Sequence, residues 1–455
     1  MEAGSSAAVD VGCHVMVTFF TTTYDKAMPE ESYSVPINIT PEGLNALVQN
    51  VLGVDEHRFD FLHKEEYIAT SLQKFLTRCG VSAEELVNIE YTPALQAKES
   101  SQLPHDDWVS SVRVPFVGQA DVLLTASYDR CVRLWDGDCC IAIGSAHDEC
   151  VNEVCVHPLR SANGAPCRTN MSDSRDGRRK RTHSKLLGDF QCVSCGKDGR
   201  VVAWQFDNEG ARLRPIGALK SHVASVDSID ISPGAGEFVA SASWDCTVKV
   251  FGWSDIVDRS TEPSAKVPVV SFTDHTRPVL ACRFSATKGA SQLFSCGLDG
   301  TLKVLDVETA VLRHQYAGDH PVQGLAVRAG GGGSDLVIAA CTDNRARMYD
   351  TRAGGQSACA KVFSGHKQWL YAASWLWRPD EGDVSSGNYF ATASEDGTVR
   401  LWDLRCSTSS LLTLDTLHTD GVLDVTYAGC GDVVSCGKDN STKLFQCLKG
   451  DSILK

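Results

Sequence analysis

Serine, histidine and aspartate recur in this sequence in an order that could support nucleophilic catalysis. In the stretch LLTASYDRCVRLWD at 123–136, Ser127 lies two residues before Asp129, and His105 precedes both. A histidine that accepts a proton from a serine, with a carboxylate orienting its ring, is the arrangement of a catalytic triad. The stretch FATASEDGTVRLWDL at 390–404 repeats the pattern. Because an active site is needed only once, the extent of the repetition decides between a catalytic and a structural role.

The pattern occurs seven times. Each copy is a short β-prone run, a turn at an aspartate and a second β-prone run, which is typical of a β-hairpin. The turn aspartates are Asp129, Asp198, Asp245, Asp299, Asp343, Asp396 and Asp439. Their separations are 69, 47, 54, 44, 53 and 43 residues, and the shorter ones match the ~40–45-residue period of a WD repeat. A histidine precedes each hairpin: His105, His147, His222, His275, His320, His366 and His418.

Each repeat holds enough β-prone sequence for four strands, which is one blade of a β-propeller. We therefore expect a mainly β fold with a seven-bladed WD-repeat propeller over 105–449. The last repeat ends without a fourth strand, so we expect the connector at 93–104 to supply the closing strand of the seventh blade. Closing the ring removes long exposed sheet edges.

In this fold the repeated polar residues have a structural role, because a buried hydrogen-bond network can pin each turn to its neighbouring strands. Two blades contain every member of the network: His105, Ser127, Asp129 and Trp135, and His366, Ser394, Asp396 and Trp402. Other blades lack members, since Gly196, Gly297 and Gly437 stand in place of the serine and Leu305 in place of the tryptophan. The repetition argues against catalysis.

Charge and cysteine content narrow the function class. The 455 residues have a formal net charge of -14, and residues 1–91 contain 14 Asp and Glu against 5 Lys and Arg. Such an acidic segment suits a basic or metal-bearing partner surface and argues against phosphate binding. No apolar run approaches the ~20 residues that cross a membrane. The 19 cysteines are expected as reduced thiols, and the single pair Cys192 and Cys195 argues against a zinc site.

A basic insertion is expected in the second blade, at 160–188. Its cluster Arg178, Arg179, Lys180 and Arg181 is typical of a nuclear localisation signal or an RNA-contacting patch. A solvated loop is the alternative, and the residues alone leave it open.

The residue before each turn aspartate is expected on one rim of the ring. We take Tyr128, Lys197, Trp244, Glu395 and Lys438 as candidate partner-binding residues, since exposed aromatic residues are enriched at the energetic centres of interfaces. The alternative for Trp244 is that its ring lies flat against its own blade.

The first ninety residues are expected to form a separate α+β domain. A flexible tail at 1–12 is followed by a ubiquitin-like (β-grasp) domain at 13–92. Its strands are predicted at 15–20, 34–39, 59–62 and 86–92, and its helix begins at Pro41 after Thr40 and ends near Gly53. Ser82 and Glu85 fit a helix capping box, which leaves Glu84 to point outward.

Four segments together resemble one known family: FDFL at 59–62, GVSAEELVNIEYT at 80–92, HDDWVSSV at 105–112 and SASWD at 241–245. With a ubiquitin-like domain before seven WD repeats, the chain resembles the nucleolar WD-repeat ribosome-biogenesis factors of the PeBoW complex, over roughly 13–449. Notchless, a sister assembly factor, shares the first-domain type but generally has an extra blade.

The resemblance implies a non-catalytic scaffold in assembly of the large (60S) ribosomal subunit and maturation of its rRNA. Its implied partners are the block-of-proliferation protein, through propeller–propeller contact, pescadillo, the pre-60S particle and the ATPase midasin. Midasin's adhesion site carries Mg²⁺ with an open position for a carboxylate. The resemblance assigns that carboxylate to Glu84, with Glu85 as backup. We therefore expect no cofactor of the chain's own, and the Mg²⁺ is held in trans by midasin.

The family implies a nucleolar and nucleoplasmic location, while direct RNA contact stays open. A Notchless-type assembly factor and a ubiquitin-pathway substrate adaptor are the alternatives.

Overall fold

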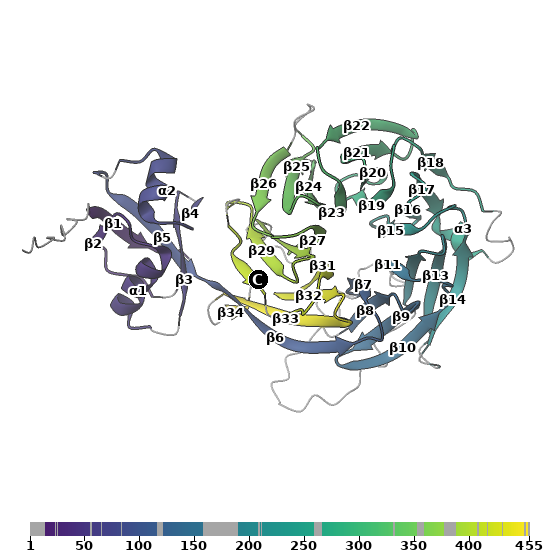
Figure 1. Ribbon diagram of the computed structural model, residues 1–455, viewed down its shortest axis with the longest axis horizontal. Coiled ribbons are helices and arrows are strands. Elements are labelled where there is room, and N and C mark those ends of the chain that lie inside the picture. The colour runs from purple at the N-terminus through teal and green to yellow at the C-terminus, as the bar shows by residue number, and fades with distance from the viewer. Residues whose placement is uncertain are drawn as a thin grey trace, which may run out of the picture.

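The computed structural model describes residues 14–22, 24, 26–54, 57–64, 66–82, 84–115, 122–157, 190–207, 210, 212–258, 266–330, 333–352, 359–376, 388–406, 409–415, 417–429, 431–449 and 452–453. The predicted tail at 1–12, the basic insertion at 160–188 and its cluster at 178–181 lie outside them. Figure 1 shows a small α+β unit beside a ring of β-sheets around a central opening. The predicted fold class is confirmed.

The N-terminal unit is one mixed sheet with two helices. Its elements are β1 (His14–Phe20), β2 (Ser32–Pro36), α1 (Pro41–Leu52), β3 (Phe59–His63), β4 (Glu66–Tyr67), α2 (Leu72–Cys79) and β5 (Val87–Pro93). The sheet order is β2-β1-β5-β3-β4, and β1 runs parallel to β5. Alternation along β1 buries Val15 and Val17 against Leu44 and Val48 of α1, as one apolar helix stripe requires.

Two features of this unit differ from the sequence predictions. The strand predicted at 34–39 ends at Pro36, because the chain turns there and the Ile39 N–H donates to the Pro36 carbonyl. The carbonyl of Ile39 then accepts the N–H of Leu72 at the start of α2, a helix that was not predicted. Its eight residues are too few for a clear helical period.

The rest of the described chain forms seven sheets in a ring. Blades 1 and 2 consist of β7 (Val109–Arg113), β8 (Val122–Ser127), β9 (Cys131–Asp136), β10 (Cys139–Ser145), β11 (Val151–Val156), β12 (Gln191–Gly196), β13 (Val201–Asp207) and β14 (Arg212–Leu219). Blades 3 and 4 consist of β15 (Val226–Ile231), β16 (Phe238–Ser243), β17 (Val248–Gly252), β18 (Val270–Phe272), β19 (Val279–Ser285), β20 (Gly289–Gly297), β21 (Thr301–Asp306) and β22 (Val311–Ala317). A short helix, α3 (Trp253–Val257), follows β17.

Blades 5 and 6 consist of β23 (Val322–Ala329), β24 (Asp335–Cys341), β25 (Arg345–Asp350), β26 (Cys359–Ser364), β27 (Leu370–Trp375), β28 (Tyr389–Ser394), β29 (Val399–Asp403) and β30 (Leu412–Leu414). Blade 7 contains β31 (Val422–Gly429), β32 (Asp432–Gly437), β33 (Ser441–Lys449) and the short β34 (Ser452–Ile453). In each blade the first strand is innermost, so β7, β11, β15, β19, β23, β27 and β31 surround the central opening (Figure 1).

The ring is closed by a strand from before the first repeat. β6 (Leu95–Pro104) pairs antiparallel with β33, from Ser441 opposite Pro104 to Lys449 opposite Leu95. Leu103 of β6 is buried with Val109 of blade 1 and Leu444 of blade 7. The outer strand of the last blade is therefore N-terminal in sequence, which ties the two ends of the repeat array together.

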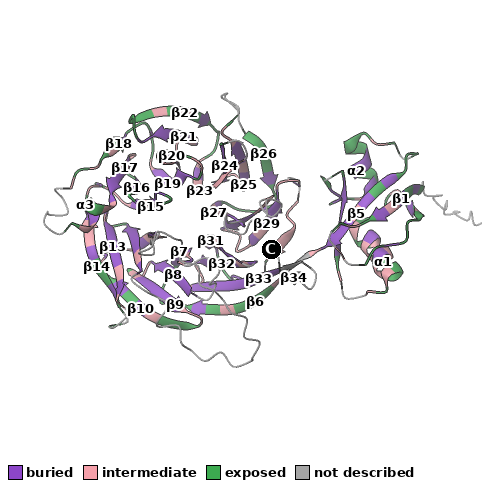
Figure 2. Ribbon diagram, turned by 180° about the vertical axis from the view of Figure 1, so that it is seen from behind, coloured by how far each residue is buried: buried purple, intermediate pink, exposed green. Residues whose placement is uncertain are grey.

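The propeller core lies between blades. Figure 2 shows buried residues along the inner strands, while the outermost strands β22 and β26 are largely exposed. Between blades 1 and 2, Trp204 is fully buried, and a Cβ at Gly144 would come within 2.6 Å of its ring. Packing at this density leaves room for glycine alone at position 144.

The N-terminal unit contacts the propeller at a second point besides β6. Leu62 and Tyr67 are buried against Cys406, which follows β29 of blade 6. The Arg405 guanidinium lies 5.6 Å from the centre of the Tyr67 ring and forms an ion pair with Asp403 at 2.7 Å. Since β5 continues almost directly into β6, the unit is attached covalently to blade 7 and by packing to blade 6.

Candidate functional site

One face of the ring carries all seven residues that precede the turn aspartates. Each donates its backbone N–H to a carbonyl in the segment that leads into the innermost strand of its own blade. Tyr128 bonds to Trp108, Trp244 to Ser225 and Glu395 to Trp369, each at 2.9 Å. The repeated hydrogen bond places these positions at equivalent heights around the opening of the central channel, and we call this the channel face.

Aromatic rings are prominent on the channel face. Trp244 is 47% exposed and Trp369 is 53% exposed. The indole N–H of Trp244 donates to Asp227 of β15, within its own blade, at 2.5 Å. Trp108 is 38% exposed, and its ring centre lies 5.5 Å from that of Tyr128. Exposed tryptophan and tyrosine are the side chains that most often dominate protein–protein interfaces.

A lysine lies between two of these rings. The Lys438 ammonium is 5.1 Å from the centre of the Trp108 ring and 5.3 Å from that of Tyr371. It also forms an ion pair with Glu395 at 2.7 Å. Burial lowers the pKa of Lys438, but Glu395 and Tyr371 together more than offset this effect, so the pKa is raised overall. Lys197, by contrast, is exposed.

The repeated histidines hold the turns. In five blades the histidine Nδ1 lies 2.7–3.0 Å from a turn-aspartate oxygen, and its Nε2 lies 2.7–2.8 Å from a strand hydroxyl. In blade 6 these partners of His366 are Asp396 and Thr392, and the indole N–H of Trp402 donates to the same Thr392 at 2.8 Å. Burial lowers the pKa of His366, so its ring is held neutral.

Ser127 and Ser394, two residues of the predicted network, hydrogen-bond to the turn aspartates. Ser394 bonds to the carbonyl of Trp369 at 2.9 Å and accepts the Asp396 N–H, so it supports the turn and does not bridge histidine to tryptophan. Ser127 likewise accepts the Asp129 N–H. The bridging hydroxyl comes two residues earlier, roughly 7 Å further along the strand and level with the indole ring.

Because this hydroxyl lies at the earlier position, blades with glycine at the later one still have a partner for the histidine. Ser194, Ser295 and Ser435 supply it in blades 2, 4 and 7. Of these three, only Ser194 also accepts an indole N–H, that of Trp204, because Leu305 and Phe445 stand in the tryptophan position of blades 4 and 7. Those blades are therefore more complete than the glycines at 196, 297 and 437 suggested.

Blades 1 and 5 form variants of the network. His105 bonds to Thr125 at 2.9 Å, and the turn aspartate Asp129 pairs with Arg133 at 2.5 Å. Trp135 donates to the same Thr125 at 3.0 Å. His105 therefore does not contact Asp129, contrary to the four-member set predicted for this blade.

In blade 5, His320 lies only two residues before its strand, where the other blades have four, and its side chain is 49% exposed. Arg347 replaces the histidine as the partner of the turn aspartate: its two terminal nitrogens donate hydrogen bonds to the Asp343 carboxylate at 2.6–2.8 Å.

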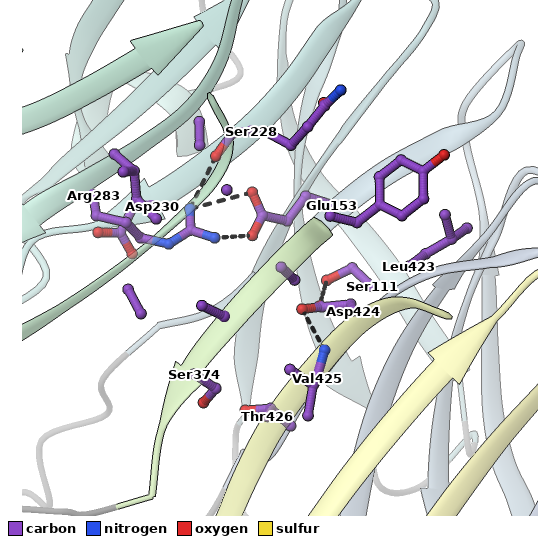
Figure 3. A pocket seen from close by; sticks show the side chains of 18 of the residues that line it. Ser111, Glu153, Ser228, Asp230, Arg283, Ser374, Leu423, Asp424, Val425 and Thr426 are labelled. Carbon is purple, nitrogen blue, oxygen red and sulfur yellow. Dashed lines mark hydrogen bonds and ion pairs between the residues drawn. The ribbon is translucent and has the colours of Figure 1, made fainter. Parts of the chain in front are cut away.

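An ionic belt lines part of the channel, in a cavity of about 430 Å³. Figure 3 shows Arg283 reaching Glu153 and Ser228, and Ser111 bonded to Asp424. Arg283 bonds to Glu153 at 2.6 Å, and Arg113 bridges Glu153 to Asp424, the latter at 2.5 Å. Blades 1, 2, 4 and 7 are thus tied together across the channel wall.

Burial and charge compete within the belt. Burial raises the pKa of Glu153, but the guanidinium groups of Arg283 and Arg113 lower it by more. The pKa is therefore lowered overall, and the carboxyl is held ionised. Asp230 also lies near Arg283, and burial raises its pKa overall. Arg113 and Arg283 are thus balanced by the carboxylates of Glu153 and Asp424.

Sequence reasoning missed the channel residues, although a signal was present. Counted from the blade histidine, the sixth position holds Glu153 and Asp424, and the eighth holds Arg113, Asp230 and Arg283. Charged residues at fixed offsets on otherwise apolar inner strands indicate a polar channel lining.

The Glu84 turn lies between α2 and β5. No helix begins at Ser82, so the predicted capping box is wrong: α2 ends at Cys79, Gly80 has φ of 66° and the chain turns toward β5. The Ser82 hydroxyl accepts the Glu84 N–H at 3.3 Å. Glu84 and Glu85 are both exposed, and neither carboxylate has an ion-pair partner among the described residues.

Among the described residues, no group of three or more His, Cys, Asp or Glu side chains is arranged to hold a metal ion. None of the described helices is long and apolar enough to cross a membrane.

The family described as NLE (NUC135) domain matches residues 15–76, and the WD domain, G-beta repeat, matches 98–136, 213–252, 266–306 and 357–403. A protein of Nematostella vectensis is 28% identical over 95% of this chain and 99% of its own length. Proteins of Arabidopsis thaliana and Oryza sativa subsp. japonica are also 28% identical, over 93% and 96% of this chain and 95% and 97% of their own lengths. All three carry the name "Ribosome biogenesis protein WDR12 homolog".

Proposed function

We propose that this chain, a homologue over nearly its full length of proteins named ribosome biogenesis protein WDR12, is a non-catalytic scaffold in assembly of the large ribosomal subunit. The propeller holds partner proteins in the maturing pre-60S particle, and the N-terminal unit is the handle by which an ATPase removes the scaffold.

One observation carries this proposal: similarity extends through both units and their junction, over 92–96% of the chain in eight relatives of the same name. Shared WD repeats alone would indicate only a propeller, since that fold serves many functions. Similarity across the NLE domain and the β6 junction favours a common use of the two units together.

The channel face is the proposed docking surface for the propeller of the block-of-proliferation protein, which in turn binds pescadillo. Support comes from its three exposed tryptophans, Trp108, Trp244 and Trp369, and from the Lys438 and Glu395 pair between them. The flat, rigid ring presents these side chains without a cost in loop ordering.

The Glu84 turn is the proposed contact for midasin. A carboxylate with no partner of its own can complete the octahedral shell of a Mg²⁺ held by the other protein. Glu84 is exposed and stands on a short turn between α2 and β5. Glu85 has the same exposure and is the alternative ligand, so the two must be separated by experiment.

The Glu84 assignment is tested by binding between the full chain and a midasin adhesion domain, with and without Mg²⁺. Glu84→Ala is expected to abolish Mg²⁺-dependent binding, and Glu85→Ala, which removes the same charge one residue away, is expected to keep it. The reverse pattern would assign the contact to Glu85, and Mg²⁺-dependent binding by both variants would refute the turn as the site.

The scaffold function is tested by depleting the chain and following precursor rRNA and free subunits on sedimentation gradients. We expect a selective loss of large subunits, which the wild-type chain restores. Normal large-subunit levels after depletion would refute the proposal. Accumulation of Glu84→Ala in late pre-60S particles would separate release from assembly.

A nucleolar and nucleoplasmic location belongs to the same proposal. The cluster Arg178, Arg179, Lys180 and Arg181, which lies outside the described residues, is the proposed nuclear localisation signal. Replacing all four by glutamine in a fluorescently tagged chain is expected to reduce nuclear accumulation. Unchanged nuclear fluorescence would exclude this role.

A further inference from the structure

Asp227 stands at the channel mouth as a carboxylate without a cation. Its Oδ2 accepts the indole N–H of Trp244 at 2.5 Å, and its Oδ1 accepts the Ser225 hydroxyl at 2.8 Å and the Asn152 amide at 3.2 Å. All three donors are neutral, and no lysine or arginine within the described ranges forms an ion pair with it. A charge taken partly out of water is stabilised best by an opposite charge.

An exposed aromatic ring lies beside this carboxylate. The Trp244 ring is 47% exposed while its N–H points to Asp227. A cation that pairs with Asp227 therefore has an exposed indole within reach, and both the ring and the carboxylate attract positive charge.

The same face contains an occupied version of this arrangement. Lys438 forms an ion pair with Glu395 and lies against the rings of Trp108 and Tyr371. The carboxylate, the two rings and the cation are all supplied by this chain. Around Asp227 the carboxylate and the exposed Trp244 ring are present, and no described residue supplies the cation.

The chain's own nearest candidate does not fill the position. Lys197 precedes the turn aspartate of blade 2 as Lys438 precedes that of blade 7, yet Lys197 is exposed and forms no ion pair with Asp227. Asp227 also lines the cavity of about 430 Å³ that opens into the channel. The position is therefore accessible from outside the molecule.

We infer that Asp227 and Trp244 form a receptor site for one cationic side chain, an arginine or a lysine, presented by a protein partner on the channel face. Charge complementarity selects the ligand, the exposed indole ring adds cation–π contact, and the channel gives depth for a long side chain. The inference rests on the proposed scaffold function only for the source of that side chain, a bound protein.

The site is tested with small peptides, which do not require the partner. The probes are acetyl-Gly-Arg-Gly-amide and its citrulline analogue, which has nearly the same shape and no charge. Binding is followed through the indole N–H resonances of the full chain labelled with ¹⁵N-tryptophan, where the Trp244 signal reports on its bond to Asp227. We expect saturable shifts of the Trp244 signal with the arginine peptide and at least about tenfold weaker binding of the citrulline peptide.

Two variants and a control locate the interaction. Asp227→Asn keeps the size of the side chain and is expected to weaken arginine-peptide binding by about tenfold. Trp244→Leu, at an exposed ring, is expected to weaken it several-fold without lowering Tm. Glu149→Gln removes the same charge from an exposed residue in the loop before β11 and is expected to leave binding unchanged.

Equal affinity for the two peptides, no saturable shift, or unchanged affinity in Asp227→Asn would each overturn the inference. The peptide measurement uses only the purified chain, so its result is independent of the depletion experiment. Retained peptide binding with normal ribosome assembly after depletion would refute the proposed function and leave the site standing. Loss of peptide binding together with defective ribosome assembly after depletion would refute the cation site and leave the proposed function standing.

Discussion

Replacing Glu153 by glutamine tests whether the ionic belt stabilises the ring. Glu153 accepts hydrogen bonds from Arg283 at 2.6 Å and from the Ile229 N–H at 2.9 Å, and it also pairs with Arg113. Its side chain is only 8% exposed. Glutamine keeps the volume but removes the negative charge that two guanidinium groups share.

The expected cost follows from the contacts that remain. Removing one partner of a buried ion pair costs about 3–5 kcal/mol, because the other charge is left uncompensated. Arg113 keeps its ion pair with Asp424, and Arg283 keeps its electrostatic attraction to Asp230. We therefore expect the lower end, about 3 kcal/mol. For a propeller of about 350 residues this corresponds to a fall in Tm of roughly 4 °C.

The assay is thermal and urea unfolding of the full chain, with Glu149→Gln as the matched exposed control. The control is expected to stay within about 0.5 kcal/mol of wild type. A double-mutant cycle with Arg283→Met should give a coupling energy of about 1–3 kcal/mol. If Glu153→Gln melts within the error of the control, the belt contributes no net stability and the reasoning is wrong.

Three further predictions concern the closure, the pH response and the domain contact. Leu103→Ala in β6 removes a side chain that is 1% exposed and should lower the free energy of unfolding in urea by about 3 kcal/mol. Gln102→Ala, at the exposed neighbouring position, should leave it nearly unchanged. Similar losses in the two variants would argue against β6 as a buried closing strand. Burial lowers the pKa of His105 to about 4, so as the pH falls the unfolded chain binds a proton at this residue before the folded chain does. The free energy of unfolding should therefore fall by about 3 kcal/mol as the pH drops from ~6.5 toward ~4. A His105→Leu chain with an unchanged pH profile would refute this. Tyr67→Ala should release the N-terminal unit from blade 6 and increase the maximum dimension in small-angle X-ray scattering, with Arg405→Lys giving a smaller effect; unchanged scattering would show that β6 alone sets the arrangement.

The parts of the fold that repeat were predictable from local patterns. Hairpins at Asp129 and Asp396 are visible because alternating apolar residues and turn residues are short-range signals. α1 was predictable for the same reason, since its apolar stripe spans three turns between Pro41 and Gly53. The brief α2 and the two-residue β4 were not, because tertiary contacts and not periodicity stabilise elements of that length.

The candidate site was only partly predictable. Trp244 and Lys438 were assigned to a rim from their place before a turn aspartate, and they lie on the channel face. Asp227, the partner of Trp244, comes from the innermost strand of the same blade, and Glu395, the partner of Lys438, comes from the adjacent blade. A spacing rule along the sequence cannot say which side chains of separate strands or adjacent repeats meet.

The sequence by itself determined the repeat unit, the number of blades and the acidic character of the N-terminal unit, because these follow from local patterning and composition. Only the tertiary structure decided which hydroxyl bridges histidine to tryptophan, how Glu153 shares its charge between Arg113 and Arg283, and that Asp227 forms no ion pair with a lysine or arginine in the described part of the chain. Those outcomes depend on distances between strands far apart in the chain. They are set when the ring closes and inner strands from different blades meet around one channel.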